Sequence, residues 1–402
     1  MSARRIFLAS ISLVAGVLLV YWAFGASRFA AGDRVFILES PVMDSWAQAW
    51  MIRGDDARFR DMDTPRAVGA YWEAVGRNPL LFGGWFALAR LERQMGATPR
   101  VDSLREFLLT HVPSSTTWRW HQLLLAGDSR DEARFTESFN FVLERLPQYR
   151  QEAVELALGF WGGWPAAFGR TDPANRWTLL LEAMARRDVD AATDLYPRLE
   201  ADPASLPDAA GQAAFVDFLL QNKRWSEAEH AWKRSALYEG NAVTNGAFET
   251  PLDGKAFGWR QGKVQGAEIR REASRDPDRR HVMRLHFLGT SNVRFDHFWQ
   301  YLPLAAGKEY EVLFSWKSER ISTDKGVYLE VRGVDCPGLR ARTAEVTGSG
   351  GWRRESLTFR APDECRMARI GLRRDESLKF DNKIAGDLWI DAVELFEGHG
   401  RQ

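Results

Sequence analysis

The sequence has few cysteines, no net charge and no familiar catalytic motif. Fifty-four basic and 54 acidic residues give a formal net charge of zero, so no overall field favours a polyanion such as nucleic acid. A phosphate-binding loop, a dinucleotide fingerprint, a metalloprotease helix and a Gly-x-Ser-x-Gly elbow are all missing. The seven histidines are scattered, and acidic residues are too common to nominate the carboxylate pair of a glycosidase. We therefore expect a protein that is not an enzyme.

Long apolar runs are also scarce, and the one from Ile6 to Phe24 contains no charged residue. As a helix it would span roughly 29 Å, close to the hydrocarbon thickness of a bilayer. Two arginines precede it and two aromatic residues lie near its end, which predicts a cytosolic N-terminus. We expect residues 1–28 to form a cytosolic tip and an uncleaved transmembrane anchor. The alternative is a cleaved signal peptide, with Ala23 and Gly25 as the small residues before the cut. Both interpretations predict that the chain is exported.

The two cysteines, Cys336 and Cys365, are the only ones in the chain. In an exported protein two lone cysteines most often join. We predict one disulfide that closes a loop of about 30 residues and contributes about 3 kcal/mol. The alternative is a pair of buried thiols.

A 34-residue repeat begins at Thr64, after a lead-in segment of mixed composition over residues 29–63. Thr64-Pro65-Arg66 recurs as Thr98-Pro99-Arg100, and the next step of 34 reaches Glu132. Threonine or aspartate before proline or glutamate is typical of an N-cap at a helix start. Prolines with the same period mark the turn within each pair: Pro79, Pro113 and Pro147. The pattern predicts three related helical hairpins.

The best copy of this repeat is AVGAYWEAVGRNPLLFGGWFALARLERQMG. It resembles the tetratricopeptide repeat, whose small, aromatic, proline and glycine positions match Ala67, Tyr71, Ala74, Asn78-Pro79, Trp85, Leu88-Ala89 and Gly96. The resemblance implies an antiparallel array of helical pairs over residues 64–239, with a groove for a protein partner. Within it we expect an aromatic loop at 160–165, then helices starting near 172, 190 and 207, and a capping box from Ser226 to Glu229.

Short alternating runs replace the helical spacing over residues 241–397. They are VMRLHFL, FWQYLPL, YEVLFSW, VYLEVRG, ESLTFRAP, ARIGLRR and LWIDAVELF. Seven or eight strands without an intervening helix predict an antiparallel β-sandwich, and the length suits one jelly roll. The predicted fold class is therefore a multidomain chain, helical first and β second.

The order of signals in this domain resembles the jelly-roll carbohydrate-binding modules that accompany cellulases and xylanases. The matching stretches are Asn245 to Glu249, Gly258-Trp259, Gln300 to Ser315, Trp352 to Pro362 and Leu388 to Leu395. The resemblance implies sugar binding and a structural calcium held by Glu249 and Asp391. We expect no other cofactor.

Alternation within the strands separates an inward set of side chains from an outward set. Trp259 and Trp316 are expected in the core. Aromatic rings exposed on a sheet are unusual, and flat rings suit the C–H faces of pyranoses. The predicted sugar platform is the outward set of rings, Trp299, Tyr301, Tyr328 and Trp389. The alternative is an interdomain seam, in which the loop over 335–351 or the helical array covers these rings.

Together these features predict an accessory protein anchored by one helix in a bacterial inner membrane, with most of the chain in the periplasm. It would serve the assembly or export of a cell-envelope polysaccharide, with the helical repeats binding a protein partner and the sandwich binding glycan. One alternative is an envelope scaffold that binds only proteins and has no sugar site. Another is an exported glycoside hydrolase with an unrecognised site.

Overall fold

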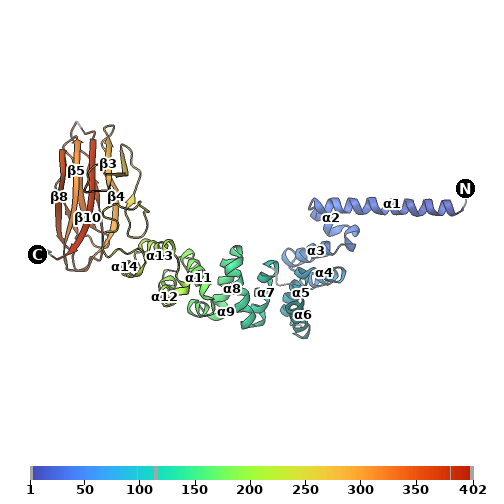
Figure 1. Cartoon of the computed structure of the whole chain (residues 1–402). Coiled ribbons are helices and arrows are strands. Elements are labelled where there is room, and N and C mark those ends of the chain that lie inside the picture. The colour runs from blue at the N-terminus through green and yellow to red at the C-terminus, as the bar shows by residue number, and fades with distance from the viewer. Residues whose placement is uncertain (1–2, 97, 113–115, 381, 399–402) are drawn as a thin grey trace. The chain divides into compact units, whose positions relative to one another are not determined.

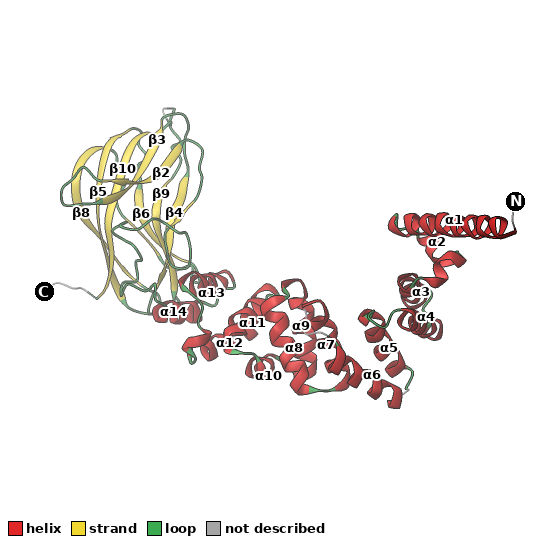
Figure 2. Cartoon of the chain, turned by 45° about the vertical axis from the view of Figure 1, so that its right-hand side comes forward, coloured by secondary structure: helices red, strands yellow, loops and turns green. Residues whose placement is uncertain are grey.

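The computed structural model describes residues 3–96, 98–112, 116–380 and 382–398. Helices form the N-terminal half of the chain and two antiparallel sheets the C-terminal half, as predicted (Figure 1, Figure 2). The chain divides into two compact units, one of residues 1–186 with 194–205 and the other of residues 187–193 with 206–402. The second unit therefore contains helical residues in addition to the sheets.

The first unit begins with helix α1, Ala3–Ala30, which is long and apolar enough to cross a membrane. The apolar side chains described along it, from Leu13 to Phe24, are largely exposed, as a lipid-facing helix requires. The lead-in segment that follows is helical: α2 (Arg34–Glu39), the 3-10 helix η1 (Pro41–Ser45) and α3 (Ala47–Phe59). Trp46 packs its ring against Trp22 and Phe29 at the end of α1.

The 34-residue period is confirmed as a period of helix starts. Helices α4 (Thr64–Arg77), α6 (Thr98–His111) and α8 (Glu132–Arg145) begin at these positions, and α5 (Phe82–Gln94), α7 (Thr116–Ser129) and α9 (Arg150–Trp161) follow them. The N-cap of α4 is Asp63, whose carboxylate accepts from the backbone N–H of Arg66 at 3.0 Å; the prediction of Thr64 was one residue late. Pro113 lies outside the described residues.

The helices described after α9 are α10 (Trp164–Arg170), α11 (Pro173–Ala185), α12 (Val189–Glu200), α13 (Ala209–Gln221) and α14 (Trp225–Arg234). Short 3-10 turns occur at Pro147–Tyr149 and Pro203–Ser205. The predicted aromatic loop is only two residues long, because Gly162 and Gly163 adopt φ of 85° and 128° and let α10 start at once. Ser226 lies inside α14, so the predicted capping box is wrong.

Within the part of the chain that the structure describes, ten strands form two five-stranded antiparallel sheets. Sheet A has the order β1-β4-β9-β6-β7 and sheet B the order β2-β3-β10-β5-β8. The strands are β1 (Arg260–Gln261), β2 (Ala267–Ala273), β3 (His281–Leu288), β4 (Phe295–Pro303), β5 (Glu309–Ile321), β6 (Tyr328–Gly333), β7 (Arg340–Arg342), β8 (Gly348–Arg360), β9 (Met367–Arg374) and β10 (Ala385–Glu397). All seven predicted runs are strands; β1, β2 and β7 were missed.

The core of the sandwich lies between the inner faces of the two sheets. Trp259 and Trp316 are each 1% exposed, which confirms their predicted place, and the ring of Trp259 stacks on Phe298 at 4.6 Å. Helices α13 and α14 pack on the same domain. Asp217 of α13 accepts hydrogen bonds from Arg260 and from the backbone N–H of Ala256. Burial nevertheless raises the pKa of Asp217.

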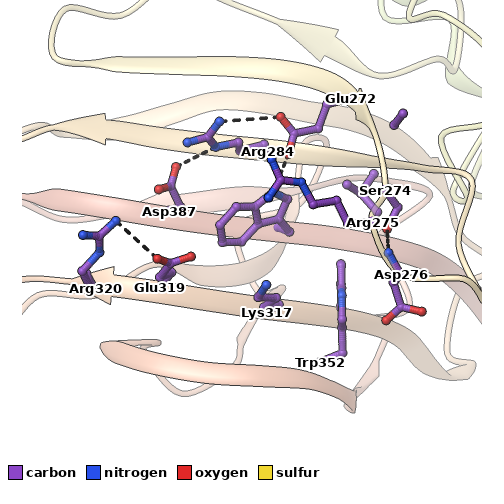
Figure 3. A pocket seen from close by; sticks show the side chains of 13 residues that line it. Glu272, Ser274, Arg275, Asp276, Arg284, Lys317, Glu319, Arg320, Trp352 and Asp387 are labelled. Carbon is purple, nitrogen blue, oxygen red and sulfur yellow. Dashed lines mark hydrogen bonds and ion pairs between the residues drawn. The ribbon is translucent and has the colours of Figure 1, made fainter.

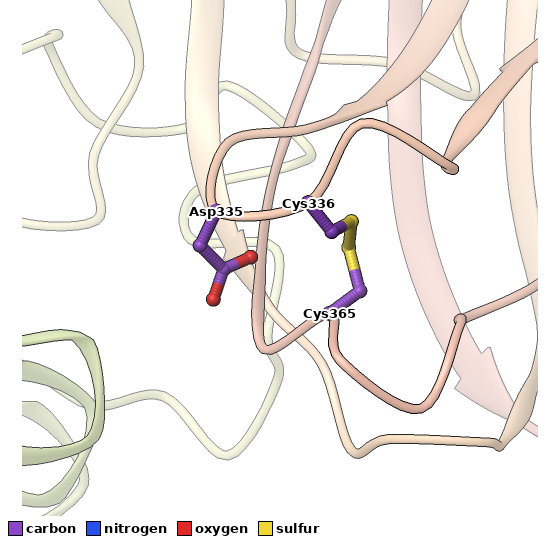
Figure 4. Close-up of side chains that lie close together, drawn as sticks. All are labelled: Asp335, Cys336 and Cys365. Atoms are coloured by element: carbon purple, nitrogen blue, oxygen red, sulfur yellow. A yellow bond between two sulfur atoms is a disulfide. The ribbon is translucent and has the colours of Figure 1, made fainter.

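A disulfide joins Cys336 and Cys365, as predicted (Figure 4). The two residues are 29 positions apart in sequence, and they connect the turn after β6 to the turn before β9. The carboxylate of Asp335 lies beside the bond and accepts from the backbone N–H groups of Arg366 and Met367. These contacts fix the two turns at one end of sheet A.

Candidate functional site

The four predicted platform rings all point outward, but they lie on two different faces. Trp299, Tyr301 and Tyr328 belong to β4 and β6 of sheet A, whereas Trp389 belongs to β10 of sheet B. The strand pattern gives the direction of a side chain within its strand but not the sheet that the strand joins. The predicted rings therefore form no single platform.

Tyr328 is buried, which corrects its predicted exposure. It is 0% exposed although it lies on the outer face of sheet A. The guanidinium of Arg342 on β7 lies 5.2 Å from the centre of its ring, and its hydroxyl donates to Asp375 at 2.9 Å. Burial raises the pKa of Tyr328 most, and the hydrogen bond to Asp375 raises it further. The loop over 335–351, which the sequence analysis named as one possible cover of the rings, contains β7. This loop therefore supplies the arginine that covers Tyr328.

Trp299 and Tyr301 are half-buried. The ring of Tyr301 lies 5.9 Å from that of Trp225 at the start of α14, so a helix covers part of this ring, as the seam alternative predicted. Trp299 stands opposite Gly371 of β9, where a Cβ atom would lie 2.7 Å from that of Trp299. The guanidinium of Arg369 lies 3.3 Å from the centre of the Trp299 ring.

The outer face of sheet B carries the larger hollow, a groove of about 580 Å³ that contains Trp389 (Figure 3). The ladders place Trp389 between Arg284 of β3 and Lys317 of β5. In the adjacent row, Asp387 stands between His286 and Glu319. In this groove, polar side chains surround the half-buried indole of Trp389.

Hydrogen bonds hold the indole and its neighbours in place. The Nε1 atom of Trp389 donates to Glu272 at 2.7 Å, and the ammonium of Lys317 lies 4.9 Å from the centre of the ring. Arg284 donates to Asp387 at 2.7 Å. Trp352 of β8 adds a second half-buried ring to the lining. The groove thus offers ring surface together with fixed donors and acceptors, which is the equipment that small-molecule sites use.

Two neighbouring side chains hold the carboxylate of Asp387 in this groove. Its burial by itself would raise the pKa of the carboxyl, but the hydrogen bonds from Arg284 and His286 outweigh that effect, so the pKa of Asp387 is lowered. The distance from its Oδ1 to Nδ1 of His286 is 2.8 Å. The carboxylate is therefore charged at neutral pH and orients both partners.

Glu249 and Asp391, the two predicted calcium ligands, each pair with a basic side chain. Calcium requires six to eight oxygen ligands. Asp391 instead pairs with Arg279 at 2.6 Å, and Glu249 pairs with His281 at 3.3 Å. One oxygen of Asp391, Oδ1, is buried without a partner. Among the described residues the one cluster of three candidate ligands is Asp335 with the two cysteines, whose sulfurs are bonded to each other. Calcium binding stays a prediction.

Sequence reasoning missed most of the groove. Arg284, Lys317 and Asp387 come from three strands that are distant in sequence, and only the register of the ladders brings them beside Trp389. A weak signal existed, because the polar residues of VMRLHFL and YEVLFSW occupy the outward parity. It did not identify which strands are neighbours.

Solved structures are similar to part of this chain, and each of the three examples below covers 39% of it. The structure described as "CBM4 structure and function" is 18% identical, with a TM-score of 0.29 and 99% of that chain covered. TmCBM61 in complex with β-1,4-galactotriose is 20% identical, with a TM-score of 0.26 and 99% covered. A Stig cyclase, Fisc from Fischerella sp. TAU, is 15% identical, with a TM-score of 0.29 and 96% covered. Because the sequence identities and TM-scores are this low, the similarities do not indicate what this chain binds.

A scan of protein-family models finds no match for the sequence. A search of curated proteins finds none either.

Proposed function

We propose that this chain is a non-enzymatic, membrane-anchored protein whose β-sandwich binds a glycan in the groove on sheet B. The observation that supports this most directly is the groove itself, which holds the half-buried indole of Trp389 between charged side chains in about 580 Å³. A pyranose packs its C–H face on such a ring while fixed donors and acceptors bind its hydroxyls.

The polar groups of the groove suit a hydroxyl-rich ligand. Glu272 accepts from Trp389 through Oε1 and pairs with Arg284 through Oε2, whereas Asp387 binds both Arg284 and His286 through Oδ1 alone. A carboxylate oxygen accepts more than one hydrogen bond. Arg284 and Lys317 supply N–H donors on either side of Trp389. Sugar hydroxyls both donate and accept, so they satisfy acids and bases in the same site.

The rest of the proposed function concerns location. Helix α1 would cross a bacterial inner membrane, and the disulfide between Cys336 and Cys365 suits an oxidising compartment, so the sandwich would lie in the periplasm. There the protein would assist assembly or export of a cell-envelope polysaccharide. The helical pairs, which resemble tetratricopeptide repeats, would hold a protein partner in a groove between them.

The test measures retardation of the full chain, purified in detergent, by polysaccharides cast into native gels. We expect at least one neutral polysaccharide to retard it. Trp389→Ala should weaken that binding by about tenfold or more, since about 1.4 kcal/mol of ring stacking corresponds to that factor. Near-ultraviolet circular dichroism checks that the variant is folded.

Phe396→Ala is the matched control, because Phe396 is a 40% exposed aromatic residue of the same strand that does not line the groove. It should leave retardation unchanged. If no neutral polysaccharide retards the protein, or if both variants bind as the unaltered chain does, the groove on sheet B is not a glycan site.

A further inference from the structure

Arginines form a row across the outer face of sheet A. The ladders place Arg332 of β6 directly opposite Arg340 of β7 on one side and Arg369 of β9 on the other. Tyr301 of β4 continues the row beside Arg369. Directly opposite residues in adjacent strands share a face, with Cβ atoms about 4.5–5.5 Å apart. Three positive charges therefore stand side by side on three neighbouring strands.

Carboxylates neutralise only part of this row. Glu330, which is 2% exposed, accepts from Arg340 at 2.8 Å and from Arg373 at 2.6 Å. Among the described residues, Arg332 and Arg369 form no ion pair with a carboxylate. Asp296 lies at the edge of the same small hollow, but its carboxylate lies 3.6 Å from His297.

The contact with the Trp299 ring favours the charged form of Arg369, but burial and neighbouring positive charges oppose it. Its side chain is half-buried, and its Nε atom is buried without a hydrogen-bond acceptor. Burial lowers the pKa of Arg369, and the positive charges of Arg332 and Arg260 lower it further. Like charges directly opposite each other destabilise a sheet. An anion bound between Arg332 and Arg369 would remove this repulsion and supply the missing acceptor.

The surroundings of the pair indicate the kind of anion. The open hollow that Arg332 and Arg369 line is small, about 30 Å³, which is room for one water-sized group. Guanidinium groups bind carboxylate, sulfate and phosphate through paired N–H donors. The half-buried ring of Trp299 lines the same hollow and adds apolar surface to it. An acidic group carried on a sugar ring matches both features.

We propose that Arg332 and Arg369, with Trp299 beside them, form a second binding site on the sandwich, which takes the carboxylate or sulfate group of an acidic polysaccharide. This site is on the opposite sheet from the groove at Trp389. It shares only the chemical class of its partner with the function proposed above, so either site can fail without the other.

The first arm of the test uses inorganic sulfate and therefore needs no glycan. The full chain is heated in sodium sulfate and in sodium chloride of equal ionic strength, and the midpoint of thermal unfolding is compared. At sulfate tenfold above its dissociation constant, linkage predicts a rise of about 3–6 °C. Arg332→Gln should lose most of this rise. In low salt without sulfate it should unfold at the same temperature or higher, because the repulsion is gone.

Two further variants control for general effects of sulfate and of substitution. Arg340→Gln makes the same change in the same row, but at an arginine that Glu330 already neutralises, so it should keep the sulfate response. Arg332→Lys keeps the positive charge, so this variant should retain much of the sulfate response. If Arg332→Gln responds to sulfate as fully as the unaltered chain, or is less stable in low salt, Arg332 is simply solvated and the site does not exist.

The second arm tests the class of ligand. Polygalacturonate in native gels should retard the full chain, the retardation should weaken with added salt, and Arg332→Gln should reduce it at least threefold while Arg340→Gln does not. Uncharged galactan should show no dependence on Arg332. If phosphatidylglycerol vesicles bind in an Arg332-dependent way and polygalacturonate does not, the assignment to a polysaccharide is overturned. Binding of neutral glycan at Trp389 is unaffected by either result.

Discussion

Replacing Glu330 by glutamine is expected to destabilise the β-sandwich by about 3 kcal/mol. Glu330 is an acid on the outer face of sheet A that is 2% exposed. It binds Arg340, whose side chain is 58% exposed, and Arg373, whose side chain is 11% exposed. Removal of one partner from a buried pair leaves the other charge uncompensated, and this costs about 3–5 kcal/mol. Arg373 is the charge left behind.

The size of this effect follows from the difference between the two partners. Arg340 can turn toward water, and loss of an exposed pair costs at most about 1 kcal/mol. Arg373 cannot, since its Nε atom is already buried without a partner. Most of the loss should therefore come from Arg373, and the lower end of the range applies because the glutamine oxygen still accepts one hydrogen bond.

The assay is denaturant unfolding of the full chain, with the transition of the β-sandwich followed separately from that of the helices. A double-mutant cycle combines Glu330→Gln with Arg373→Gln and with Arg340→Gln. We expect a coupling energy of about 2 kcal/mol or more with Arg373 and below about 1 kcal/mol with Arg340. If Glu330→Gln costs under about 1 kcal/mol, or if the two couplings are equal, the burial argument is wrong.

Three further perturbations have definite expected results. Reduction of the disulfide should lower the stability of the sandwich by about 3–4 kcal/mol from loop entropy alone, measured by unfolding with and without reductant. Gly371→Ala should cost at least about 1 kcal/mol, since its Cβ would lie 2.5 Å from the carbonyl oxygen of Phe298; a neutral result would mean that β4 shifts freely. Asp387, whose pKa is lowered on folding, contributes stability above about pH 4 that disappears as pH falls through its folded pKa. The loss of stability caused by Asp387→Asn should therefore become smaller in acid. A loss that does not depend on pH would contradict the role of the ion pairs of Asp387.

Local signals in the sequence were sufficient to predict most of the helices and strands. The period of 34 residues placed the starts of α4, α6 and α8, because proline and a capping acid act within one turn of the chain. Alternation identified seven strands and the core position of Trp316. Strand β2 was missed because its sequence, AEIRREA, has four charged residues in seven, as an exposed edge strand often does.

The candidate sites were harder to predict because they depend on which strands are neighbours. Trp389 was predicted as a ligand-binding ring, but Arg284 and Lys317 join it only through ladders between β3, β10 and β5. The row of arginines on sheet A likewise exists only in the paired sheet, since Arg332 and Arg369 are far apart in the chain. Tyr328 shows the reverse case, in which a ring predicted to be exposed is covered by Arg342 of a strand too short to predict.

The packing of α13 and α14 on the sandwich determines where the chain can be cut. The change from helix to strand near residue 241 suggests a boundary, but Phe257, 0% exposed, packs its ring against Trp232 of α14, and Arg260 takes Asp217 of α13 as its counter-ion. A fragment that starts at residue 241 would expose that ring to water and leave the arginine unpaired. A soluble fragment for crystallisation or ligand screening should therefore begin near Leu206, ahead of both helices.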